Sequence, residues 1–225
     1  MFISQIRLRP DTDPMRLARQ FDNSSTYREH QLIWQLFPRD PNAERDFLFR
    51  AEKRNGTQRY LLLSQRQPEA DPAIWQVETK TYRPRLHSGQ RLAFQLRANP
   101  VVTRKNAQGR SSRHDIIMDA KKQISWSTLP AAERPHLPTL IQQAGERWLA
   151  ERLARHGANL EAVRVDGYQP QSSHKKGAKK PITHSSLDFE GTLQVEDPEP
   201  FTQLLYTGLG PAKAFGCGLL LVRRL

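Results

Sequence analysis

The order of the elements predicted over the first third of the chain is the feature that most constrains its fold. Apolar and polar residues alternate from Phe2 to Leu8, which predicts a strand. Further along, Asn55-Gly56 separates two strand-like runs and is typical of a hairpin turn. The elements predicted here are, in order, a strand over 2–8, helices over 14–21 and 25–37, strands over 47–53 and 59–64, a short helix over 73–76 and a strand over 77–83.

The rest of the chain repeats this order more loosely after His87-Ser88-Gly89, which we interpret as a linker. The clearest helix has apolar residues near helical spacing and stops at Gly157. The elements predicted here are a strand over 91–105 interrupted at Asn99-Pro100, a helix over 139–156, strands over 160–168 and 182–195, a short helix over 200–207 and a strand over 215–223. Both parts follow the order β-α-β-β-α-β, so we predict an α+β fold of two tandem ferredoxin-like domains, residues 1–88 and 89–225.

The charge of the chain points to a polyanion as partner. Its 225 residues include 35 Lys and Arg against 23 Asp and Glu, a formal net charge of +12. Two segments, 104–113 and 167–187, carry basic residues and no acid. Glycine and serine interrupt them, which disfavours a membrane-surface helix and favours RNA, although a solvated charge run is the alternative. The candidate RNA-binding residues are Arg104, Lys105, Arg110, Arg113, Lys175, Lys176, Lys179 and Lys180.

Two Gly-x-Gly pairs stand just before the final strand. Glycines at this density allow positive φ and close backbone approach, and exposed amides in such a turn form an anion site. Lys213 lies between the pairs and adds a point charge. A tight turn packed against a buried strand is the alternative interpretation. The candidate RNA-binding residues of this loop are Gly208, Gly210, Lys213, Gly216 and Gly218.

The histidines and the single cysteine exclude several classes of site. None of the seven histidines pairs with another at the i, i+4 spacing of a metalloprotease, and Cys217 alone can form neither an intrachain disulfide nor a cysteine zinc cluster. We expect neither metal nor cofactor. The chain has no apolar run long enough for a membrane helix and no signal-peptide core, so we expect a cytoplasmic protein without a membrane partner.

Tyr27 and His30 are the candidate catalytic residues. They lie three residues apart on a predicted helix, so both side chains fall on one face. An imidazole titrates near neutrality and can give or take a proton, and a phenol can donate or orient. A surface pair or a hydrogen-bonded core edge is the alternative interpretation of the same spacing.

With these residues in view, the chain resembles the CasE family, the CRISPR RNA-processing endoribonucleases of the type I-E Cascade complex. The resemblance is densest at 27–38, 45–50, 96–100 and 208–220. It implies two ferredoxin-like domains, metal-independent cleavage of the precursor at the base of each repeat hairpin, and a 2′,3′-cyclic phosphate product. It also implies that His30 is the principal catalytic residue, that Tyr27 assists, and that the enzyme stays on its product beside other Cascade subunits. We expect a monomer when the protein is free.

The chemistry of such a cut leaves two assignments open. The ribose 2′-OH can serve as the internal nucleophile, so the protein must align it and manage two protons. His30 could be the base on the 2′-OH or the acid on the departing 5′-oxygen, and Lys213 with the loop amides could stabilise the phosphoryl charge or hold RNA away from the cut. The competing functions are a non-catalytic RNA-binding subunit of the same superfamily and a general basic RNA-binding protein.

Overall fold

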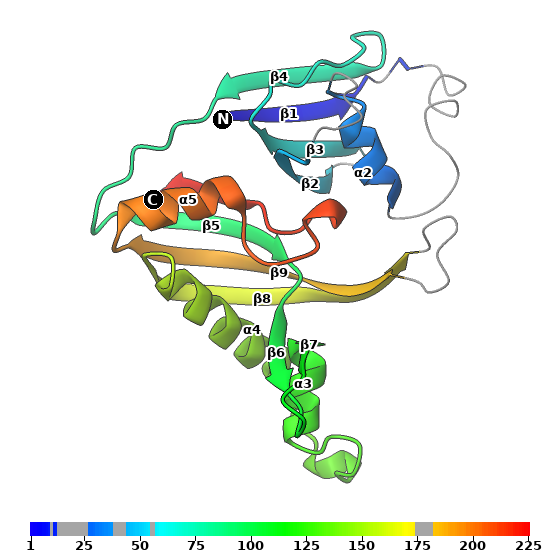
Figure 1. The fold of residues 1–225 in the computed structure, drawn as a ribbon, viewed down its shortest axis with the longest axis vertical. Coiled ribbons are helices and arrows are strands. Elements are labelled where there is room, and N and C mark those ends of the chain that lie inside the picture. The colour runs from blue at the N-terminus through cyan, green and yellow to red at the C-terminus, as the bar shows by residue number, and fades with distance from the viewer. Residues whose placement is uncertain (10, 13–26, 38–43, 55–56, 174–181) are drawn as a thin grey trace.

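The computed structural model describes residues 1–225 except 10, 13–26, 38–43, 55–56 and 174–181. Two four-stranded antiparallel sheets dominate it (Figure 1). The N-terminal sheet has the order β2-β3-β1-β4. Its strands are β1 (Phe2–Leu8), β2 (Phe47–Arg54), β3 (Thr57–Ser64) and β4 (Trp75–Thr81), and α2 (Tyr27–Trp34) connects β1 to β2.

The C-terminal sheet repeats this arrangement, because its order β10-β5-β9-β8 places its fourth, first, third and second strands side by side. The helices α4 and α5 pack against the sheet in one apolar core, which contains Leu149, Leu153 and Phe201. The elements are β5 (Arg91–Ala98), α4 (Leu137–Ala154), β8 (Ala158–Ser173), β9 (Ile182–Val195), α5 (Pro198–Thr207) and β10 (Leu220–Arg224). The α+β class with tandem ferredoxin-like halves is confirmed.

A basic hairpin and a short helix are inserted between β5 and α4. The chain turns at Asn99-Pro100, as predicted, and leaves the sheet to form a separate two-stranded ladder (Figure 1). Asp115 then caps a helix by accepting the backbone N–H groups of Ile117 and Met118, each at 2.8 Å. The inserted elements are β6 (Val101–Lys105), β7 (Ser111–Asp115), α3 (Ile116–Gln123) and the 3₁₀ turn η1 (Ala131–Glu133).

Two predicted elements differ in the structure. The short helix over 73–76 is wrong: the Asp71 carboxylate accepts the N–H of Ala73 at 2.9 Å and closes one turn, after which β4 begins at Trp75. The last strand begins at Leu220 rather than at 215, because a 3₁₀ turn η2 (Lys213–Phe215) and the loop after it come first. The helix predicted over 14–21 lies outside the described residues.

A small apolar cluster and an ionic network join the two sheets. Leu48 and Leu63, on the face of the N-terminal sheet away from α2, pack against Leu219 of the C-terminal half. Beside them, Arg97 donates two hydrogen bonds to Asp188, both at 2.9 Å. Arg50, from β2, lies 3.6 Å from the same carboxylate. The apolar contact and the shared carboxylate therefore hold the α2 half of the molecule against the half that carries the glycine-rich loop.

Candidate functional site

Helix α2 presents His30 at the edge of the N-terminal core. Leu32 and Ile33 are 3% and 0% exposed and anchor the helix in the core. His30 is only half-buried, and its ring centroid lies 6.1 Å from that of Phe47 at the start of β2. Tyr27 opens the same helix, but its side chain falls outside what the structure describes. The helix therefore holds the imidazole at the edge of the core, half-buried against Phe47.

Trp34 fixes the protonation pattern of this imidazole. It lies one helical turn after His30, and its indole N–H donates to Nε2 of His30 at 3.0 Å. A nitrogen that accepts a hydrogen bond carries no proton, so the neutral ring holds its proton at Nδ1. The contact favours the neutral imidazole over the imidazolium, because protonation at Nε2 would break it.

Burial lowers the pKa of His30, and the positive charge of Arg45 lowers it further. Both effects penalise the charged ring. The imidazole is therefore neutral at pH 7, which is the form that can accept a proton. Arg45 precedes β2 by two residues and is exposed, so its guanidinium is open to a ligand.

Lys213 brings a second cation to the same place. The turn η2, which begins at Lys213, packs against α2 and β2. Burial lowers the pKa of Lys213, and Arg45 again lowers it further. Its Nζ donates to the carbonyl of Thr207, the last residue of α5, at 2.6 Å. His30, Arg45 and Lys213 together form what we call the cationic cluster, in which Arg45 acts on both other groups.

Packing accounts for most of the glycines in the loop before β10. A Cβ on Gly208, at φ +76°, would lie 2.7 Å from both the carbonyl oxygen of Gly218 and a Leu48 methyl, and one on Gly216 would meet the Phe49 ring at 3.3 Å. The N–H of Gly218 is taken by the carbonyl of Arg97 at 2.7 Å. RNA contact by this loop stays a prediction, and the partly exposed Gly210 and Lys213 are the members best placed for it.

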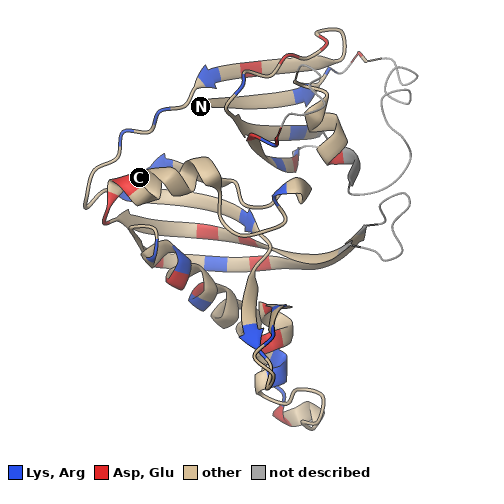
Figure 2. Ribbon diagram, viewed as in Figure 1, with Lys and Arg blue, Asp and Glu red and all other residues tan. Residues whose placement is uncertain are grey.

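The basic hairpin β6–β7 extends from the C-terminal half, and Figure 2 shows basic residues along it and on α3 below it. Lys105, Arg110 and Arg113 are exposed. Arg104 is also exposed, but it pairs with Asp119 of α3 at 2.5 Å. The structure thus groups four of the predicted RNA-binding residues on one projecting element, separate from the cationic cluster. Lys175, Lys176, Lys179 and Lys180 lie outside the described residues.

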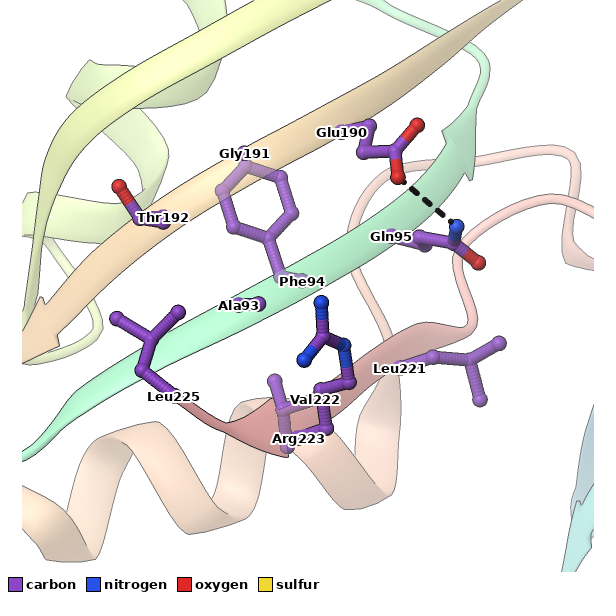
Figure 3. Close-up of a pocket in the computed structure, with 10 residues that line it drawn as sticks. All are labelled: Ala93, Phe94, Gln95, Glu190, Gly191, Thr192, Leu221, Val222, Arg223 and Leu225. Atoms are coloured by element: carbon purple, nitrogen blue, oxygen red, sulfur yellow. Dashed lines mark hydrogen bonds between the residues drawn. The ribbon is translucent and has the colours of Figure 1, made fainter.

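The C-terminal sheet carries a pocket without the groups that surround His30. A pocket of about 360 Å³ lies over β5, β9 and β10, and Figure 3 shows Gln95 donating to Glu190 within it at 3.3 Å. Its lining holds one cation, Arg223, and no imidazole. In the part of the chain that is described, no three His, Cys, Asp or Glu side chains gather as metal ligands. No helix there is long and apolar enough to cross a bilayer.

Sequence reasoning missed two residues of this site. Trp34 could have been found, since it stands four residues after His30 on a predicted helix and that spacing brings side chains together. Arg45 carried no such signal. Its proximity to His30 arises only when β2 packs under α2, a contact between segments that no local pattern encodes.

Comparisons with known proteins agree on one family. A sequence model described as "CRISPR associated protein" matches residues 1–224. The chain is 35% identical over 197 residues to the CRISPR system Cascade subunit CasE of Escherichia coli (strain K12), covering 86% of this chain and 89% of that protein. It is 29% identical over 232 residues to the CRISPR-associated endoribonuclease Cse3 of Thermus thermophilus, covering 99% of each. A solved structure of CRISPR endoribonuclease Cse3 bound to 19 nt RNA matches with a TM-score of 0.69 and 26% identity, covering 99% of this chain and 100% of that one.

Proposed function

Because the chain belongs to the family of CRISPR-associated proteins, we propose that it is a metal-independent endoribonuclease that cleaves precursor CRISPR RNA at the base of repeat hairpins. The product carries a 2′,3′-cyclic phosphate, and the protein stays bound to it as a subunit of a Cascade complex. The relatives support this assignment, since one is named a Cascade subunit and another an endoribonuclease. A solved structure of the endoribonuclease contains RNA.

The observation that carries the proposal is the neutral imidazole of His30 beside two cations. In the reaction, the 2′-oxygen forms a bond to phosphorus while the bond from phosphorus to the 5′-oxygen breaks. One proton leaves the 2′-OH and one reaches the departing 5′-oxygen. A neutral imidazole can take the first proton, so we assign His30 as the general base. Trp34 must then release Nε2 when RNA binds, because that nitrogen carries the lone pair. Tyr27, on the same helix, is assigned to orient or donate.

Arg45 and Lys213 supply the electrostatic part of catalysis. Negative charge builds on the nonbridging oxygens of the phosphoryl group in the transition state, and fixed cations stabilise it more strongly than they stabilise the substrate. Both residues stand near His30, since Arg45 lowers its pKa and the turn that begins at Lys213 packs against α2. Two neighbouring positive charges repel each other in the free protein, and a phosphodiester offsets that repulsion on binding.

Recognition of the hairpin falls to β6–β7. An A-form stem hides its base edges in a narrow major groove, so phosphates and 2′-hydroxyls are the groups that a basic hairpin can contact. Lys105, Arg110 and Arg113 present three exposed cations for this purpose. We thus assign RNA binding to the β6–β7 hairpin and the cleavage reaction to the cationic cluster.

The decisive experiment compares two repeat hairpins in EDTA, one all-ribo and one with a 2′-deoxy sugar at the scission point. We expect the first to be cut to a 2′,3′-cyclic phosphate and the second to remain intact. His30→Ala should slow cutting by about 10²–10⁴-fold while hairpin affinity is kept. Loss of cutting in EDTA would overturn metal independence. Equal cutting by the wild type and the His30 variant would remove His30 from the mechanism, and binding without any cutting would favour a non-catalytic subunit.

A further inference from the structure

A second pocket, of about 600 Å³, lies where the basic hairpin meets the C-terminal sheet. Its walls come from Asn99 just after β5, from β6, β7 and α3, from β8 and β9, and from the glycine-rich loop through Pro211. These elements converge below the loop in Figure 1. The pocket shares no lining residue with the cationic cluster. Its volume falls within the range of small-molecule sites, about 300–1,000 Å³.

Asp115 holds the walls of this pocket rigid. Its carboxylate accepts the hydroxyl of Tyr168 from β8 at 3.2 Å and the hydroxyl of Ser185 from β9. The same carboxylate caps α3 through two backbone N–H groups. Burial raises the pKa of Tyr168 to about 12, and Asp115 contributes, so its ring stays a neutral aromatic surface. One acid thus fixes three elements around the pocket before any ligand arrives.

His184 adds a flat ring with unmet hydrogen-bonding capacity. It stacks on Phe215 of η2 with centroids 4.5 Å apart and planes at 28°. Burial lowers its pKa, so the ring is neutral. Neither ring nitrogen has a hydrogen-bond partner among the described residues, although both are shielded from water. An unpaired buried polar group is costly, and the pocket that His184 lines is where a partner can enter.

The rim and the remaining walls fit a nucleotide. Arg113 lines the pocket with an exposed guanidinium and makes no ion pair within the described part of the chain. Asn99, Ser172 and Thr183 add amide and hydroxyl groups. Flat rings, a few polar groups and one cation at the mouth match a base with its phosphate. The neighbouring basic hairpin would bring RNA to this place.

We infer that this pocket binds one unpaired nucleobase of the RNA next to the repeat hairpin, with its phosphate on Arg113. The inference rests on the proposed function and deepens it. A paired stem is read mainly by shape, whereas an unpaired base can be splayed out, stacked and hydrogen-bonded on its edges. The pocket therefore gives the protein sequence preference at a nucleotide outside the stem.

The test uses Thr183→Trp, which fills the mouth from an exposed position, and Thr139→Trp as the control, an exposed threonine on α4 that does not line the pocket. Three uncleavable RNAs with a 2′-deoxy sugar at the scission point are compared: the bare hairpin, the hairpin with unpaired flanks, and flanked hairpins with a single abasic site moved along the flanks. We expect one abasic position to lower wild-type affinity by about 10-fold, as loss of one stacked base does. Thr183→Trp should lose the same factor with the intact flanks and keep wild-type affinity for the bare hairpin.

Three outcomes would overturn the inference. The first is an affinity gain from the flanks that survives every abasic substitution, which would mean that only the backbone is bound. The second is an equal gain in wild type and Thr183→Trp. The third is a Thr183→Trp variant that binds all RNAs normally but fails to join other Cascade subunits, which would make the pocket a protein-docking site. Each of these can occur while the all-ribo hairpin is still cut, so they differ from failure of the proposed function, in which the all-ribo hairpin is not cut.

Discussion

The indole N–H of Trp34 donates to Nε2 of His30 across one turn of α2, at 3.0 Å. This contact settles which nitrogen of the ring is unprotonated and removes that lone pair from solvent. It also links the catalytic proposal to the fold, because Trp34 itself packs edge-on against Phe47 of the N-terminal core, at a centroid distance of 5.2 Å. Substituting Trp34 should therefore alter the acid–base properties of His30 while it leaves helix α2 largely unchanged.

Trp34→Phe should raise the pKa of His30 toward its ordinary value of 6.5. The variant removes a donor that favours the neutral ring while it keeps an aromatic ring in place. Because the neutral form is the proposed base, the cleavage rate should fall near pH 6 and stay close to the wild-type rate at pH 8. The His30 ring signals followed by NMR across pH give the pKa, and cleavage at limiting RNA, which reports the ionisation of the free enzyme, gives the rate.

Trp126→Phe is the matched control, since Trp126 contacts Lys121 of α3 and lies in the inserted segment away from α2. It should leave both the His30 titration and the pH–rate profile unchanged. A His30 pKa that stays the same in Trp34→Phe would show that the hydrogen bond contributes nothing to it.

A substrate with a changed leaving group distinguishes whether His30 acts as the general base or as the general acid. His30→Ala should slow cleavage by about 10²–10⁴-fold, the usual contribution of one proton-transfer residue. A substrate whose scissile 5′-oxygen is replaced by sulfur expels a thiolate, which needs no proton. If His30 is the base, the variant should lose the same factor on both substrates; recovery on the sulfur substrate would instead make it the acid. His87→Ala, at an exposed histidine in the connection between the sheets, serves as the control.

Arg45→Gln tests the cationic cluster. The pKa values of His30 and Lys213 should both rise, since the positive charge of Arg45 lowers each of them. Cleavage at pH 7 should slow by about 10-fold or more, because a cation near the developing phosphoryl charge is lost. Arg45→Lys, which keeps the charge, should recover part of the rate. Arg85→Gln, an exposed arginine in the connection between the sheets, should cut normally.

Much of the fold could be predicted because its strands carry local signals. Alternation over Phe2–Leu8 matches β1 at both ends. Strands β2 and β3 pair antiparallel as the hairpin signal predicted, although Asn55-Gly56 itself lies outside the described residues. Strand β7 could not be found this way, because its residues are polar and largely exposed and so have no buried face to produce alternation. For α3 there was a signal, since Asp115 precedes two isoleucines in the position of an N-cap.

The site was less predictable than the fold. The spacing of Tyr27 and His30 places them on one helix, yet the cations around His30 come from a strand entry and from η2, which is distant in sequence. The glycine-rich segment before β10 shows the same limit of prediction from sequence. Its composition suggested a phosphate cradle, but contacts with Leu48 and Phe49 explain why Gly208 and Gly216 lack side chains. Tertiary contacts, which no single segment encodes, decide both cases.

The basic hairpin should control the salt dependence of RNA binding. Lys105→Ala combined with Arg110→Ala removes two exposed cations, so the slope of log affinity against log salt should fall by about 2. Affinity should drop equally for stems of different sequence, because phosphate contacts carry no base information. Lys80→Ala with Arg83→Ala removes the same charge from the N-terminal half. Equal slopes in the two double variants would show general attraction rather than contact through the hairpin.

Asp188 should contribute more to the free energy of unfolding than its two hydrogen bonds alone would. It accepts two bonds from Arg97 and lies 3.6 Å from Arg50, whose side chain is 12% exposed. Asp188→Asn removes the carboxylate that Arg97 and Arg50 share across the junction of the sheets, and Arg50 keeps Glu52, at 3.2 Å, as its ion-pair partner. We expect the free energy of unfolding to fall by about 1–3 kcal/mol, the cost of leaving charged partners unsatisfied at partial burial.

Glu161→Gln is the control. It breaks an Arg–carboxylate pair of similar geometry, 2.7 and 2.9 Å to Arg91, but Arg91 is 59% exposed. That variant should lose less free energy of unfolding than Asp188→Asn does, because solvent screens an exposed pair. Urea titrations of both variants give the comparison, and equal losses would mean that the Asp188 network does not brace the two sheets against each other.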